Sequence, residues 1–179
     1  MQVEAPISNP PQAYLDIILP LIGSARSFLE SGESLIPAAF AGNLTTRKTL
    51  PVMMNSKSDE AKDESAAAIK RAAAIIDADF VFLVMEAWSL RPDKLHRADE
   101  IRDKYGSIGN SPYAMDVVTM TLETRHGLWV AQMPIKPKGY SKKKRTFGQP
   151  EFRFFTEAKG RFVDLLPARD GGPLPHSLH

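Results

Sequence analysis

The chain has 179 residues, of which 43% are hydrophobic and 25% are charged, with a formal net charge of +2. This size and mixture are typical of one globular domain. The absence of cysteine excludes disulfide frameworks, thiolate nucleophiles, iron–sulfur clusters and cysteine zinc sites. The longest apolar run, residues 80–85, is far shorter than the roughly 18 residues that cross a membrane. No basic segment followed by an apolar one opens the chain, so we expect a cytoplasmic protein that does not enter membranes.

The N-terminal region predicts one helix. Ser8 and Asn9 precede two prolines, which suits a helix start because short polar caps accept unpaired N–H groups and proline fits the first turn. Apolar residues then recur at helical spacing over residues 14–29, and Gly32 is a suitable stop. Because Pro20 lies inside this pattern, we expect it to kink or divide the helix.

Two short strands are expected next, at residues 35–41 and 49–54, with Gly42-Asn43 as turn residues between them. Pro37 and Pro51 each remove a backbone donor from the ladder. We therefore expect edge positions or strand ends for these prolines.

A second helix is predicted to start near Ser56–Asp59 and to end near Asp77. Its start fits a capping box, and the acidic residues that follow favour the positive end of the helix dipole. Its apolar stripe consists mostly of small side chains, which predicts close packing against a sheet. The next segment, residues 80–85, is apolar on both faces and is therefore expected in the centre of that sheet, covered on both sides.

The second half of the chain predicts mainly strands. The expected elements are a short helix at Pro92–Tyr105 and strands at 117–124, 128–135, 152–155 and 162–166. His126-Gly127 is expected to turn the first pair of strands into a hairpin. Lys159-Gly160 is expected to connect the last pair.

This order of elements favours the α+β class, because strand pairs dominate and only one crossover has βαβ length. We expect a single α+β domain at residues 1–166. Its antiparallel or mixed sheet has about five to seven strands, with two main helices and one short helix packed on it, on one face. Residues 167–179 mix proline, glycine and polar residues and are expected to form a flexible C-terminal tail.

Charge is distributed unevenly along the sequence. Residues 1–90 carry 7 basic and 11 acidic side chains, whereas residues 91–179 carry 16 and 10. Six basic residues fall within the basic segment, residues 136–145, which contains no acid. Such a segment suits contacts with phosphates or with an acidic protein, and it also suits a solvated loop that binds nothing. The candidate binding residues are Lys136, Lys138, Tyr140, Lys142, Lys143, Lys144 and Arg145.

Glu86 is the candidate catalytic residue. It follows the apolar run and shares a strand face with Phe82, Val84 and Trp88. A carboxyl group in that setting has a raised pKa and suits acid or base chemistry, unless the strand surfaces there and the side chain meets water or a cation.

Weak metal-ligand candidates lie on the short helix. His96, Asp99 and Asp103 have i, i+3 and i+7 spacing, which places an imidazole and two carboxylates along one side. Ordinary helix ion pairs between interleaved charges explain the same pattern. The phosphate-loop, dinucleotide and nucleophile-elbow motifs are all absent from the sequence.

Three functional hypotheses follow. The first is a non-enzymatic binding or regulatory module that contacts an acidic protein surface or nucleic acid through the basic segment and self-associates as a homo-oligomer. The second is a small hydrolase or transferase that uses Glu86 with the face formed by His96, Asp99 and Asp103. The third is a structural subunit of a larger assembly. No cofactor is expected.

Overall fold

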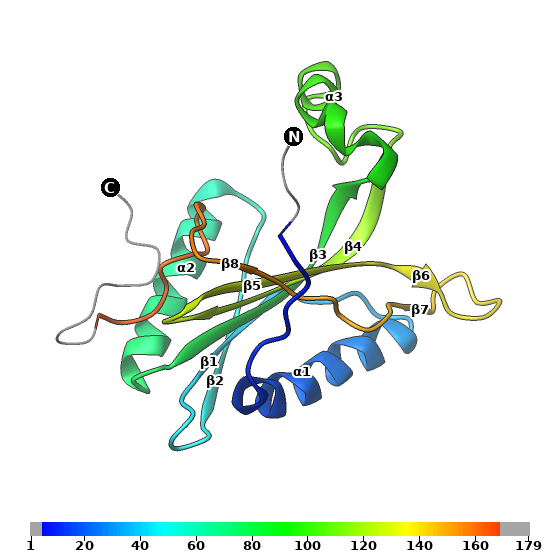
Figure 1. Ribbon diagram of the computed structural model, residues 1–179. Helices are drawn as coiled ribbons and strands as arrows, with labels where there is room; N and C mark the ends of the chain where they lie inside the picture. The colour runs from blue at the N-terminus through cyan, green and yellow to red at the C-terminus, as the bar shows by residue number, and fades with distance from the viewer. Residues whose placement is uncertain (1–4, 169–179) are drawn as a thin grey trace.

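A computed structural model describes residues 5–168, so residues 169–179 of the expected tail lie outside the described part of the chain. The elements are α1 (Gln12–Glu30), β1 (Ala38–Gly42), β2 (Thr49–Met53), α2 (Asp59–Ile75), β3 (Phe80–Leu90), a 3₁₀ helix η1 (Pro92–Arg97), α3 (Ala98–Tyr105), β4 (Ala114–Thr124), β5 (Gly127–Pro134), β6 (Lys136–Pro137), β7 (Arg145–Thr146) and β8 (Arg153–Phe155). The fold class is α+β, as predicted (Figure 1).

The main sheet has six strands in the order β2-β1-β3-β4-β5-β8, and every neighbouring pair is antiparallel. β6 and β7 form a separate two-stranded sheet. β3 occupies the interior of the main sheet, and its first five residues, Phe80–Val84, are all buried. This confirms the central position that the apolar run predicts. β2 lies at one edge with Pro51 in it, as the missing backbone donor requires.

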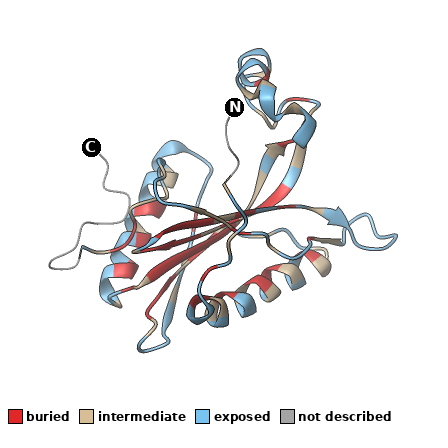
Figure 2. Cartoon of the chain, viewed as in Figure 1, coloured by how far each residue is buried: buried red, intermediate tan, exposed pale blue. Residues whose placement is uncertain are grey.

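The two long helices cover opposite faces of the sheet, so the expectation of helices on one face is wrong (Figures 1 and 2). Phe80, Phe82 and Val84 pack in one core cluster with α1. Val81 and Leu83 pack in a second cluster with α2. The physical reason is the central strand itself, because alternate side chains point to opposite faces and both sets are apolar.

α1 begins without a side-chain cap, since its N-cap is Pro11. Ser8 was expected to cap the helix, but its backbone N–H instead donates to the Phe152 carbonyl at 2.8 Å. The helix runs through Pro20 without division, and Pro20 lies on the exposed side. The carbonyl of Asp16 that loses its helical partner also belongs to an exposed residue, so water can satisfy it.

α2 begins within the expected range Ser56–Asp59, but its N-cap is Ser58, two residues after the Ser56 of the expected capping box. The Ser58 hydroxyl accepts a hydrogen bond from the Ala61 N–H at 3.0 Å. Asp59 and Glu60 occupy the first turn, where they match the helix dipole. Small buried side chains line the inner side, as predicted, and they are Ser65, Ala66, Ala72 and Ala73 beside Ile69.

β3 and β4 extend beyond their neighbours as a two-stranded ribbon. β1 pairs only with residues 80–84 of β3, and β5 pairs only with residues 117–124 of β4. The outer pairs, from Trp88↔Asp116 to Leu90↔Ala114, therefore stand beyond the sheet. η1 and α3 sit at the end of this ribbon, away from the sheet on which a short helix was expected to pack (Figure 1).

The turn between β4 and β5 is one residue earlier than predicted. Thr124 pairs with Gly127, so Arg125 and His126 form the loop. The Thr124 hydroxyl accepts from the His126 N–H at 3.1 Å and donates to the Gly127 carbonyl at 3.3 Å. Gly127 has φ +149°, and a Cβ there would lie 2.5 Å from the Phe154 ring. Glycine is required at the first residue of β5 for both reasons.

The C-terminal described segment does not form the strand expected at residues 162–166. It lies on the α2 face instead, where Leu165 and Leu166 are buried. The edge formed by β8 is partly covered by the N-terminal segment, because Ile7 forms an isolated bridge with Arg153.

Gly42 allows the central strand to pack against β1. A Cβ at Gly42 would lie 2.0 Å from the Phe80 ring, which also contacts Tyr14 edge-on at 5.7 Å. We expect Gly42→Ala to lower the free energy of unfolding by about 1–3 kcal/mol, measured by urea denaturation. Gly23→Ala is the control, since a Cβ there meets nothing within 4 Å and should stabilise α1 by about 0.5–1 kcal/mol. Equal effects of the two substitutions would contradict this account.

Candidate functional site

The basic segment forms most of a small hairpin, which we call the basic hairpin: β6, the turn after it and β7, residues 136–146. Lys136 pairs with Thr146, and Pro137 pairs with Arg145. The Lys138 N–H donates to the Lys144 carbonyl at 2.9 Å, which closes the turn. The basic hairpin continues from β5 past the end of the sheet and lies over the C-terminal end of α1 (Figure 1).

Glu86 holds one strand of the basic hairpin. Its carboxylate accepts two hydrogen bonds from the Arg145 guanidinium, at 3.0 and 3.1 Å. The Leu35 backbone N–H also donates to Glu86 Oε1, at 2.8 Å. The two charged side chains are each only about a quarter exposed, so solvent screens this bidentate pair weakly. The sequence could not reveal the pair, because 59 residues separate Glu86 from Arg145.

Glu30 holds the hairpin from the end of α1. Its carboxylate accepts from Lys138 Nζ at 2.8 Å and from the Thr146 hydroxyl at 2.8 Å. These hydrogen bonds, with Lys138 contributing most, lower the pKa of Glu30. The carboxylate is therefore ionised at neutral pH. Neither Glu30 nor Thr146 is indicated by the sequence, since nothing in their local spacing points to a partner more than 100 residues away.

Arg26 ties the segment after the hairpin to α1. Its guanidinium donates to the Phe147 carbonyl at 3.2 Å and to the Gly148 carbonyl at 3.1 Å, and it lies 4.7 Å from the centre of the Phe147 ring. The buried Phe147 ring belongs to the core cluster under α1. The chain leaving the basic hairpin is thus fixed to the domain core.

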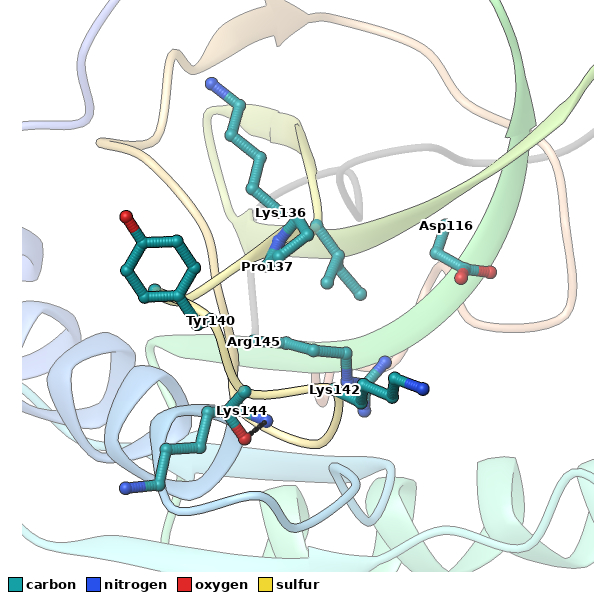
Figure 3. Close-up of a pocket in the computed structure, with 10 residues that line it drawn as sticks. Asp116, Lys136, Pro137, Tyr140, Lys142, Lys144 and Arg145 are labelled. Atoms are coloured by element: carbon teal, nitrogen blue, oxygen red, sulfur yellow. Dashed lines mark hydrogen bonds between the residues drawn. The ribbon is translucent and has the colours of Figure 1, made fainter.

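Four lysines of the basic hairpin form no ion pair with the described residues. They are Lys136, Lys142, Lys143 and Lys144, and all four are exposed. Three of them line a solvent-open hollow of about 420 Å³, together with Asp116, Ile135, Tyr140 and Arg145 (Figure 3). Lys143 does not line it and instead lies beside Gly32, just after the end of α1, where a Cβ on Gly32 would be 3.5 Å from Lys143 Cβ.

The seven candidate binding residues therefore divide into two groups. Lys138 and Arg145 have carboxylate partners and position the hairpin. The remaining lysines and Tyr140 are exposed to solvent. Asp116 is the one charged lining residue that was not among the candidates from the sequence. Its only signal was its place at the end of an alternating strand.

The weak metal-ligand candidates do not form a ligand cluster. Asp99 pairs with Arg102 at 3.1 Å, within the same helix. Within residues 5–168, no group of three or more histidine, cysteine or carboxylate side chains is arranged to hold a metal ion. His96 lies on η1, whereas Asp99 and Asp103 lie on α3, so the expected single helix face is divided between two helices. All three residues are exposed, and both helices lie beyond the sheet, away from the basic hairpin (Figure 1).

A buried carboxyl lies elsewhere, at Glu123 on β4. The residue is 2% exposed, and its Oε2 accepts from the backbone N–H groups of Leu165 and Leu166 at 2.9 and 3.2 Å. Burial raises the pKa of Glu123 to about 7, and the nearby Asp164 adds to this effect against the opposing backbone hydrogen bonds. Glu123 therefore changes charge near neutral pH inside the α2-side core.

The ion pair between Glu86 and Arg145 yields a prediction about stability. We expect Glu86→Gln and Arg145→Gln each to lower the free energy of unfolding, because each leaves a half-buried partner charge unpaired. In a double-mutant cycle by urea denaturation, the coupling energy should be about 1–2 kcal/mol. A coupling energy near zero would show that the pair does not hold the hairpin.

Glu123 yields a prediction about pH. Because its pKa is raised on folding, the folded state binds the extra proton, and its contribution to stability is full below about pH 4.5 and lost as pH rises through about 7. The difference in unfolding free energy between wild type and Glu123→Gln should shift by on the order of 3 kcal/mol between pH 4.5 and 8, with wild type relatively weaker at pH 8. Parallel pH profiles of the two proteins would contradict the buried-carboxyl account.

No helix among the described residues is long and apolar enough to cross a membrane. Comparisons of the chain with protein-family models, with curated proteins and with solved structures find no match. The function must therefore be inferred from the residues of this chain and their contacts.

Proposed function

We propose that this protein is a non-enzymatic binding module whose basic hairpin contacts an anionic partner, either nucleic acid or an acidic protein surface. The observation that carries the proposal is the division of charges in the hairpin. Two cations are used to fix it to the domain, and four exposed lysines have no ion-pair partner among residues 5–168. A rigid support lowers the ordering cost of binding, which a mobile loop would incur in full.

The positive charge is also concentrated by the fold. Lys136, Lys142 and Lys144 line one hollow, where their charges act together on a bound anion. β6 contributes Lys136, and the turn of the hairpin contributes Lys142 and Lys144. The run of lysines in the sequence does not by itself predict that these three side chains line one hollow.

The catalytic hypothesis gains no comparable support. Both carboxylate oxygens of Glu86 accept hydrogen bonds, from Arg145 and from the Leu35 N–H, so the group already has a positioning role. Its other proposed helpers, His96, Asp99 and Asp103, lie with α3 beyond the end of the sheet (Figure 1). Two functional hypotheses stay predictions, which are the hydrolase or transferase and the structural subunit. The cytoplasmic location and the homo-oligomer also stay predictions.

The test uses heparin as a polyanion without bases. We expect labelled heparin to bind wild type in fluorescence anisotropy, with affinity falling steeply as salt rises. In Lys142→Ala/Lys143→Ala/Lys144→Ala, the slope of log affinity against log salt should be smaller by about 2–3, since each lost phosphate-type contact removes roughly 0.7–0.9. Arg145 is left unchanged because its loss would disturb the hairpin.

The matched control is Lys48→Ala/Lys57→Ala/Lys70→Ala. It removes the same charge from exposed lysines outside the hairpin. Its salt slope should equal that of wild type. If the two triple variants weaken binding equally, or if wild type does not bind heparin at low salt, the proposed function is wrong.

A further inference from the structure

Tyr140 stands at the tip of the basic hairpin with its ring free of the protein. Its relative exposure is 107%, the highest among the exposed large hydrophobic residues within 5–168. The ring takes part in no aromatic or cation–π contact with the described residues. An aromatic ring in this position contributes nothing to the core, so folding alone does not account for it.

The turn that carries Tyr140 is nevertheless ordered by hydrogen bonds. Gly139 before it has φ +62°, which suits a tight turn. The Ser141 hydroxyl after it accepts from the N–H groups of Lys143 and Lys144, both at 3.3 Å. Because the Lys138 N–H also bonds to the Lys144 carbonyl, the backbone on both sides of the ring is fixed. The ring is thus presented on a defined turn.

The hollow beside the ring combines three kinds of group. Figure 3 shows Tyr140 and Asp116 well apart among the lining residues, with Lys142 and Arg145 between them in this view. Lysines attract phosphates, whereas the exposed Asp116 carboxylate repels them and accepts hydrogen bonds from amino groups. This set suits a ligand with both phosphates and bases better than a bare phosphate.

From this arrangement we infer that the hollow binds single-stranded nucleic acid, with a base stacked on Tyr140 and the neighbouring phosphates held by Lys136, Lys142 and Lys144. The inference rests on the proposed function and names the partner class for the same hairpin. A single strand exposes the faces of its bases, so an aromatic ring beside a cationic groove stacks on them with little regard to sequence.

Two alternative partners fit the geometry less well. A β-ribbon that reads duplex DNA lies within the major groove, which is about 12 Å wide. The basic hairpin has only two residue pairs, and the ion pair between Lys138 and Glu30 holds it against the end of α1, so it is not a free arm. An acidic protein surface would use the lysines but has no planar base to cover Tyr140.

The experiment separates bases from phosphates. The probes are a labelled oligothymidylate of about 20 nucleotides, an abasic oligodeoxynucleotide of the same length, the matching duplex and heparin, each measured by fluorescence anisotropy at one low salt concentration. The proteins are wild type, Tyr140→Ala and Tyr140→Phe. Since the ring is free of the protein, both variants should fold, and circular dichroism checks this.

We expect Tyr140→Ala to weaken oligothymidylate binding about tenfold, while Tyr140→Phe keeps the affinity because it keeps the stacking ring. Binding of the abasic probe and of heparin should be the same in all three proteins. Wild type should bind the single strand more tightly than the duplex.

The inference and the proposed function fail in different ways. If heparin binding depends on the hairpin lysines but Tyr140→Ala binds oligothymidylate like wild type, single-strand recognition is wrong and the binding function stands. The same holds if the duplex or the abasic probe binds as tightly as the single strand. If no probe binds wild type at low salt, both are wrong.

Discussion

The structure depends on one constraint, which is that residues Phe80–Val84 of β3 must be buried on both faces. A strand with apolar side chains on both faces is unfavourable where one face meets water, since each exposed large side chain would lose about 1.5–3 kcal/mol of hydrophobic stabilisation. This places β3 inside the sheet, with β1 and β4 as its antiparallel neighbours. It also brings α1 to one face of the sheet and α2 to the other. Residues 85–89 of the same strand are not fully buried, and there the Glu86 carboxylate accepts hydrogen bonds from Arg145.

The basic hairpin follows from where that constraint ends. Backbone pairing between β1 and β3 stops at Val84. Beyond this point, the Glu86 carboxylate accepts a hydrogen bond from the backbone N–H of Leu35, which lies before β1 and outside the ladder. The same carboxylate binds Arg145, so one side chain joins the approach to β1, the central strand and the hairpin. Glu30 adds a second attachment from α1. Carboxylates from the acidic first half of the chain thus position the basic second half, and this explains why the charge asymmetry is compatible with one compact domain.

The sequence predicted features that depend on local pattern and missed those that depend on distant partners. Alternation and apolar runs located β3, β4 and β5, and small side chains identified the inner side of α2. The turn at Arg125-His126 was misplaced by one residue, because the Thr124 hydroxyl and the Phe154 ring, which determine it, are not visible in a turn dipeptide. The basic segment was visible as composition, but its division into positioning and free cations was not, since Glu30 and Glu86 come from far away in the chain. Residues 162–166 read as a strand, yet they cover Glu123 instead.

The two edges of the sheet limit how copies of this protein can associate. Beside β8, the Ser8 N–H donates to the Phe152 carbonyl, and the Arg153 guanidinium donates to the Ala5 carbonyl, so a strand from another molecule would first have to displace residues 5–8. The β2 edge carries Pro51, which offers an incoming strand no N–H at that position. Such edges act against fibril-like stacking and against dimers that join two sheets into one. Crowded or concentrated protein should therefore resist β-mediated aggregation, and any specific assembly has to be built from side-chain surfaces rather than from shared backbone ladders.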